Sequence, residues 1–319
     1  MKKALRILAL AFGVVGQNSM AQTITETFGS GTNQFSIDFV SIGNPGNTAD
    51  SGTYLYGGGS FSAGSVNYLY NVGKYEISRD AILKASSEGG LGISMADLSF
   101  TSGGNRPNRP ATGITWSDAA KFVNWLNTST GSQIAYKFNE LGTFQLWNPS
   151  DAGYQSTNPF RNSLARYFLP SRDEWYKAAY GSPDGTWFKY PTGSNDVPAD
   201  VSQGVSPGTA VYYRAPSIGP ADITNAGGLS AFGTMAQGGN ATEWIESAFD
   251  GVNDVADEKR EYLGGEWHNT AYVLGSDGRN DTSPTGYIGF RIASVPEPSA
   301  LSLLAVGLGG LAMMRRRRS

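Results

Sequence analysis

The sequence contains no cysteine and a single histidine, His268. Without thiols the chain has no disulfide, no thiolate metal site and no cysteine nucleophile. A lone imidazole also cannot supply an iron site built from several histidines, and Cu(I) prefers sulfur ligands. The composition therefore excludes copper and iron centres of these kinds and leaves stability to packing and bound ions.

Charged side chains are scarce as well, at 16% of the residues against roughly 25% in ordinary soluble domains. Seven of the 24 basic residues and one of the 27 acidic residues lie in the two terminal segments described below, so the region between them has a net charge near −9. An acidic surface repels phosphate backbones. We therefore expect no nucleic-acid partner.

Glycine and aromatic residues are plentiful, with 42 glycines and 12% aromatic side chains. Glycine permits tight turns and close approaches of the backbone, whereas aromatic side chains bury large areas per residue. This combination is typical of a loop-rich domain with a neutral polar surface.

The N-terminus has the three parts of a secretory signal. Three basic residues within the first six precede the apolar run Ile7–Val15, and the small-x-small site Ser19–Ala21 follows. Nine apolar residues are too few for a helix that crosses a hydrocarbon core of ~30 Å. We predict a signal peptide over residues 1–21, which signal peptidase cuts between Ala21 and Gln22.

The C-terminus, residues 295–319, combines a short motif, an apolar run and a basic end. The run covers Ala300–Met314, and as a helix it would reach only ~23 Å, a marginal membrane span with its basic end in the cytoplasm. The flanking residues are Pro296, Glu297 and Pro298 before the run and Arg315, Arg316, Arg317 and Arg318 after it.

This order of parts resembles the PEP-CTERM sorting signal, which an exosortase handles. The resemblance implies export, transient anchoring in the inner membrane through a short transmembrane helix, and delivery to the cell envelope or the extracellular exopolysaccharide matrix. A permanent tail anchor is the alternative.

Between the two ends we find no fixed-period repeat and no dividing linker, so residues 35–294 are expected to form one domain. Residues 22–34 are rich in Thr and Gly and predict a loose lead-in. Alternation of polar and apolar residues predicts a strand over residues 36–40 and a second one through residues 66–72.

Three helices are predicted from capping signals. Ser117 precedes apolar residues at helical spacing that end near Gly131, Ser171 opens a capping box with Glu174, and Ser78 precedes a weaker helix over residues 79–85.

Residues 186–240 are mostly Gly, Pro, Ser and Asn, and predict a long irregular segment. Short strands are expected at residues 243–246, 261–263 and 288–293. Together with the helices, these elements predict an α+β domain in which loops dominate.

The motifs then follow one another in a specific order. They are NVGKYEIS (71–78), GITWSDAA (113–120) with NWLN (124–127), FLPSRDEW (168–175), GNATEW (239–244), LGGEW (263–267) and GFR (289–291). This succession resembles the formylglycine-generating enzyme family, also called the sulfatase-modifying-factor domain. The resemblance implies an irregular, loop-rich variant of the C-type lectin fold. The tryptophans of these motifs are expected to serve core packing.

Family members that oxidise a sulfatase cysteine use two cysteines after the Gly-Gly-x-aromatic motif. Asn269 and Leu274 stand roughly at those positions here, so formylglycine generation by the known cysteine and copper route is not expected. A residual pocket would be sought at Trp267, His268 and Asn269, with Glu266 and Arg291 nearby.

The resemblance also implies calcium at the Gly-Asn-x-x-Glu-Trp motif. Carbonyl oxygens of Gly239 and Ala241 and the Glu243 carboxylate would be ligands, which suits a hard cation. Ala236 replaces a side-chain oxygen usual in the family, so the site would be weakened.

Two functions remain open from the sequence. The first is a non-catalytic binding or scaffold module that contacts exopolysaccharide or another envelope protein. The alternative is an enzyme of unknown chemistry that uses the pocket around Trp267, His268 and Asn269.

Overall fold

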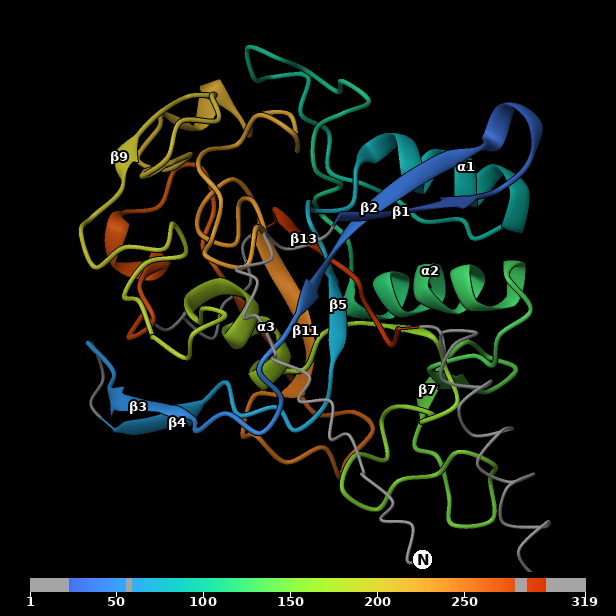
Figure 1. Cartoon of the computed structure of the whole chain (residues 1–319). Coiled ribbons are helices and arrows are strands. Elements are labelled where there is room, and N and C mark those ends of the chain that lie inside the picture. The colour runs from blue at the N-terminus through green and yellow to red at the C-terminus, as the bar shows by residue number, and fades with distance from the viewer. Residues whose placement is uncertain (1–22, 56–58, 279–285, 297–319) are drawn as a thin grey trace, which may run out of the picture.

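The computed structural model describes residues 23–55, 59–278 and 286–296 (Figure 1). The predicted signal peptide with its cleavage site, and the predicted C-terminal helix with its arginines, lie outside the described residues. Within the described part of the chain, no helix is long and apolar enough to cross a membrane.

Three α-helices and five small sheets make up the regular structure of these residues. The helices are α1 (Arg79–Gly89), α2 (Trp116–Ser129) and α3 (Arg172–Tyr180). The largest sheet has the order β1-β2-β5-β14-β8, and a three-stranded sheet has the order β12-β11-β13. Three two-stranded sheets pair β3 with β4, β6 with β7 and β9 with β10.

The strand bounds are as follows: β1 Thr23–Phe28, β2 Phe35–Ile42, β3 Asp50–Thr53, β4 Ser60–Ala63, β5 Tyr70–Gly73, β6 Lys137–Phe138, β7 Phe144–Gln145, β8 Tyr167–Phe168, β9 Ala199–Asp200, β10 Thr209–Ala210, β11 Thr242–Ala248, β12 Arg260–Leu263, β13 Ile288–Phe290 and β14 Ala293–Ser294.

The N-terminal lead-in is ordered, contrary to the prediction of a loose segment. Its first residues form β1, which pairs antiparallel with β2 from Thr23 opposite Val40 to Phe28 opposite Phe35. Threonines at every second position of β1 alternate with Ile24, Glu26 and Phe28, a pattern suited to an edge strand, and Phe28 is buried at its end. Strand β1 therefore belongs to the largest sheet of the domain, and the long β1–β2 hairpin crosses the molecule diagonally in Figure 1.

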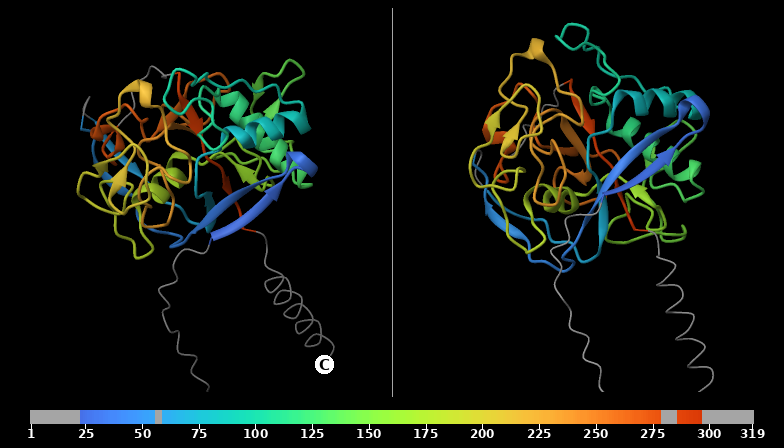
Figure 2. Two further views of the ribbon diagram at one scale, coloured as in Figure 1. Left: turned by 90° about the horizontal axis from the view of Figure 1, so that it is seen from above. Right: turned by 45° about the horizontal axis from the view of Figure 1, so that its top comes forward.

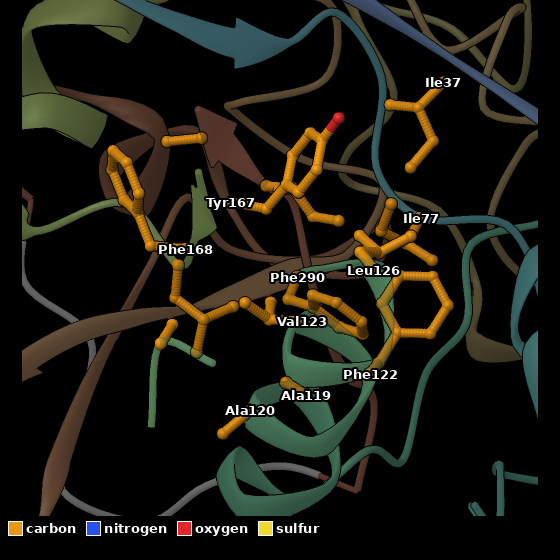
Figure 3. Packing of buried hydrophobic residues seen from close by; sticks show 14 of the residues in the cluster. Ile37, Ile77, Ala119, Ala120, Phe122, Val123, Leu126, Tyr167, Phe168 and Phe290 are labelled. Atoms are coloured by element: carbon orange, nitrogen blue, oxygen red, sulfur yellow. The ribbon is translucent and has the colours of Figure 1, made fainter. Parts of the chain in front are cut away.

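Helix α2 supplies one side of the main core. Its cap is Thr115, whose hydroxyl accepts a hydrogen bond from the Asp118 amide, so the prediction of Ser117 as the cap was two residues late. The helix turns Phe122, Val123 and Leu126 inward. Figure 3 shows these side chains gathered beside Phe290, whose ring meets that of Phe122 edge-on at 5.6 Å.

The other two helices agree with their capping signals. Ser78 caps α1, which is one turn longer than predicted, and Ser171 and Glu174 form the predicted capping box of α3. Figure 1 shows α1 and α2 on one side of β5 and α3 on the other.

Two strand predictions need correction. The alternation through residues 66–72 yields only β5, because Tyr68 and Leu69 are exposed and the chain before Tyr70 is irregular. The predicted strand at 288–293 is divided between two sheets: β13 runs parallel to β11, whereas β14 pairs with β5 and β8. The last segment of the chain thus links the two sheets.

The first and last described residues leave the domain on the same side of the molecule, as both views in Figure 2 show. Val295 donates a backbone hydrogen bond to the Arg166 carbonyl at 3.0 Å, which holds the end of β14 against the neighbouring segment.

Candidate functional site

Four of the sequence motifs meet in one buried ion pair. Arg291 and Glu243 are both fully buried, and the guanidinium binds the carboxylate at two points, Nε to Oε2 at 2.6 Å and Nη2 to Oε1 at 2.5 Å. Trp175 adds a third donor from its indole nitrogen to Oε2 at 2.6 Å. The remaining Arg291 hydrogens reach the backbone carbonyls of Gly73 and Met235. Both charged groups are therefore saturated by protein partners.

A second buried carboxylate, that of Glu76, lies next to this pair. It accepts hydrogen bonds from the Asn240 side chain at 2.6 Å and from the Ala241 amide at 2.9 Å. Burial, followed by the charge of Glu243, raises the pKa of Glu76 well above its usual range. Asn240 itself has a φ of 60°, and its side-chain oxygen accepts from the Ala221 amide. The Gly-Asn-x-x-Glu motif thus forms a backbone turn at Asn240 that is held by hydrogen bonds to Glu76 and Ala221.

The calcium ligands predicted in this motif do not fit a metal. Both Glu243 oxygens face N–H donors, and a cation placed there would meet the Arg291 guanidinium. Among the described residues, no three of His, Asp and Glu gather as a metal-binding group. We therefore assign no calcium to Gly239, Ala241 and Glu243; calcium binding by the domain as a whole stays a prediction.

Trp267 and Asn269 were predicted to line a residual pocket, but their side chains contact neighbouring parts of the domain. Trp267 is fully buried and packs on Tyr287 with ring centroids 4.8 Å apart. The Asn269 side chain accepts a hydrogen bond from the Glu266 amide at 2.9 Å, and its carbonyl accepts one from Tyr213. Neither residue lines any of the four cavities described in this domain.

His268 faces a carboxylate, as the enzyme alternative requires. Its Nε2 lies 3.3 Å from Oε1 of Glu266, which is fully buried, while the imidazole is about a quarter exposed. Partial burial lowers the pKa of His268, so the ring is neutral at pH 7. His268 lines none of the four cavities either. The pair has the chemical groups of a base and its orienting carboxylate but no described cavity beside it.

The largest of the four cavities lies on the face of β11 that carries Trp244, opposite the face on which Glu243 binds Arg291. It has a volume of about 760 Å³, which lies within the range usual for small-molecule sites. The start of α2, the turn into β7, strands β11 and β13, and the loop before β12 surround it. Its aromatic residues are Trp116, Phe144 and Trp244. We call this cavity the tryptophan cleft.

Arg260 shapes one wall of the tryptophan cleft. Its guanidinium lies over three rings, 3.9 Å from the centroid of Phe160, 4.5 Å from Trp116 and 5.1 Å from Phe144. The two terminal nitrogens donate to the carbonyls of Glu258 and Ala256. Burial lowers the pKa of Arg260 to about 10, which still leaves it charged at pH 7. Arg260 thus anchors the loop that forms the cleft rim.

The tryptophan cleft was missed by reasoning from sequence, which assigned Trp116 and Trp244 to core packing. Trp116 is indeed buried, but Trp244 is only partly so. Strand alternation offered a signal, because neighbours in a strand point to opposite faces. Glu243 faces the ion pair, so Trp244 faces away from it.

Comparison with known protein families now adds to this geometry. Residues 69–295 match the sulfatase-modifying factor enzyme 1-like domain. The chain belongs to that family. The order of the motifs predicted this assignment from the sequence, and the prediction is confirmed. No curated protein matches the chain.

Three solved structures have a similar fold. Variable protein 1 of Treponema denticola superposes with a TM-score of 0.58 at 19% identity, over 86% of this chain and 99% of that one. CarF has a TM-score of 0.54 at 16% identity, over 82% and 99%. PvdO from Pseudomonas aeruginosa has 0.50 at 14%, over 85% and 98%. At these identities the likeness confirms the predicted fold, the loop-rich fold of the formylglycine-generating enzymes, and no more.

Residues 294–318 match the PEP-CTERM protein-sorting motif. This confirms the resemblance noted in the C-terminal segment. The motif is a signal for exosortase-dependent sorting, and it indicates that this protein is exported to the cell envelope.

Proposed function

We propose that this family member is a non-catalytic binding module that works at the cell envelope or in the extracellular matrix. On this proposal, signal peptidase removes the first 21 residues, and the C-terminal segment holds the protein transiently in the inner membrane until exosortase acts. The tryptophan cleft would then bind the ligand.

One observation carries the proposal: the tryptophan cleft is a roomy cavity with aromatic walls, whereas His268 and Asn269, at the position of the family's reaction centre, are only partly exposed and line none of the four described cavities. Trp267 and Glu266 are fully buried, and Asn269 replaces a thiol that the known oxidation requires. These observations support a binding role for the tryptophan cleft, which lies apart from the positions of the family's reaction centre.

The experiment is a binding assay with the exported protein, purified after processing in an exosortase-bearing host. Extracellular polymer from that host and detergent-extracted envelope proteins would be immobilised separately, and retention of the protein on each would be measured. Retention on either one that is reduced by Trp244→Ala supports the module. If the protein is retained neither on the immobilised polymer nor on the immobilised envelope proteins, the proposal is contradicted.

The pairing of His268 with Glu266 favours one second candidate, an enzyme with a histidine base. An enzyme of that kind would show turnover that falls steeply in His268→Gln. A binding module retains its ligand unchanged in the same variant, so the two candidates predict opposite results.

A further inference from the structure

The tryptophan cleft offers aromatic surface without indole hydrogen-bond donors. The Trp244 indole nitrogen donates to the Ile114 carbonyl at 2.7 Å, and that of Trp116 donates to the Ile245 carbonyl at 3.0 Å. Each indole N–H is therefore already used by the backbone. What Trp244 presents to the cleft is ring surface, which binds apolar groups by contact.

The rim of the cleft is rich in acceptors. Asp257 is exposed and Glu258 is half-buried, and both belong to the loop that Arg260 holds. Oε1 of Glu258 accepts from the Val255 amide at 3.3 Å, which leaves Oε2 for another donor. On the opposite rim, the Gln145 amide nitrogen donates to the carbonyls of Phe144 and Thr143, so the acceptor oxygen of this amide is the atom left for a ligand. These carboxylate and amide oxygens suit a ligand that donates hydrogen bonds.

The charges around the cleft exclude anionic ligands. The loop before β12 carries Asp250, Asp254, Asp257 and Glu258 against one lysine, Lys259, and the region between the terminal segments is near −9 overall. The one buried cation, Arg260, has its terminal nitrogens tied to carbonyls and its plane against aromatic rings. It is therefore not placed to pair with an incoming acid.

A ligand that combines apolar ring faces with many hydroxyl donors and no charge meets all of these conditions. We propose that the tryptophan cleft binds a neutral oligosaccharide, with one sugar ring stacked on Trp244 and its hydroxyls donating to Asp257 and Glu258. The volume of about 760 Å³ leaves room for more than one sugar. This inference rests on the proposed function, because it names the ligand class of the same cleft.

The test is calorimetric titration of the exported protein with defined probes, together with tryptophan fluorescence. The neutral probes are tetrasaccharides of glucose in α and β linkage, of mannose and of N-acetylglucosamine; the acidic probe is tetragalacturonate. We expect at least one neutral probe to bind and tetragalacturonate not to bind. Trp244→Ala should weaken binding about tenfold or more, as removal of a central aromatic contact does.

Two further variants keep the test sound if Trp244→Ala is poorly folded. Asp257→Asn and Glu258→Gln leave the aromatic wall intact, replace carboxylate acceptors by amides, and should each weaken binding a few-fold. The matched control is Tyr213→Ser, because Tyr213 is 68% exposed and lies outside the cleft. It should bind as the parent does.

The outcomes separate the two proposals. Binding of a neutral probe that Trp244→Ala and both rim variants leave unchanged overturns the assignment to this cleft. Preference for tetragalacturonate, or cleft-dependent retention of an envelope protein with no sugar binding, overturns the ligand class while the binding module stands. Failure of every probe, polymer and envelope extract overturns the proposed function as well.

Discussion

Strand β11 separates two regions, each with a buried arginine, and the two arginines differ in the groups they contact. On one side, Arg291 has a carboxylate partner at 2.5 Å and 2.6 Å and three backbone acceptors, the carbonyls of Gly73, Lys74 and Met235. On the other side, Arg260 stacks on aromatic rings, and its Nε has no hydrogen-bond partner among the described residues. The first region holds the fold together, and the second leaves room for a ligand.

The adjacent residues Glu243 and Trp244 divide between these regions. This difference teaches that a family motif can be kept for two reasons at once. Glu243 joins β11 to the segment between β13 and β14 through Arg291, whereas Trp244 lines the tryptophan cleft. Retention of the motif is therefore no sign that the family's reaction is retained.

The largest expected effect comes from breaking the ion pair. Arg291→Met leaves the Glu243 carboxylate buried without its cation, which should lower the free energy of unfolding by about 3–5 kcal/mol. Chemical denaturation measures this loss. Recovery of part of it in the double variant Glu243→Leu with Arg291→Met would show that the stranded charge is the cause.

Arg260→Met provides the matched comparison on the other side of β11. Methionine keeps most of the packing against Phe160 but loses two charged hydrogen bonds, so we expect a smaller loss of about 1–3 kcal/mol. The variant should also lose ligand binding, because the loop carrying Asp257 and Glu258 loses its anchor. An equal loss of stability in both arginine variants would refute the contrast between the regions.

Two glycines sharpen the same contrast at the level of the backbone. Gly239 has a φ of 89°, and an added Cβ would lie 2.3 Å from the Val211 carbonyl oxygen, whereas Gly142 at the cleft rim has a φ of 76° and open space. Gly142→Ala should cost only the conformational penalty of about 1 kcal/mol, and Gly239→Ala should cost more because the backbone has to move. Thermal melting of the two variants compares them, and a larger loss for Gly142→Ala would contradict the interpretation.

The smallest effect is expected at His268. Burial lowers its pKa, so the unfolded chain, with a pKa of about 6.5, binds a proton more readily than the folded one. Its contribution to stability is therefore full above about pH 6.5 and is lost as the pH falls below that value. His268→Gln should remove this part of the acid sensitivity and leave melting at pH 8 almost unchanged. Because the chain has one histidine, a single imidazole NMR signal reports the titration, and a pKa above 6.5 would overturn the argument.

The sequence was sufficient for local features whose signal lies within a few residues. Ser171 and Glu174 specify the start of α3 because both partners of the capping box lie on one turn. The motif order also indicated the family, and the absence of thiols led to the prediction that the known cysteine and copper route is not used. The predicted cap at Ser117 was wrong. Thr115 caps the helix instead, because its hydroxyl accepts a hydrogen bond from the amide of Asp118, three residues further on.

Longer-range features were decided only by the tertiary structure. A Thr- and Gly-rich lead-in becomes strand β1 because β2 offers it a free edge, and Glu243 pairs with Arg291 across 48 residues. The tryptophan cleft depends on five separated segments meeting around Trp244. Capping and strand alternation act between neighbours in the chain, whereas the partner of a buried charge or the open face of an aromatic ring depends on which distant segments pack beside it.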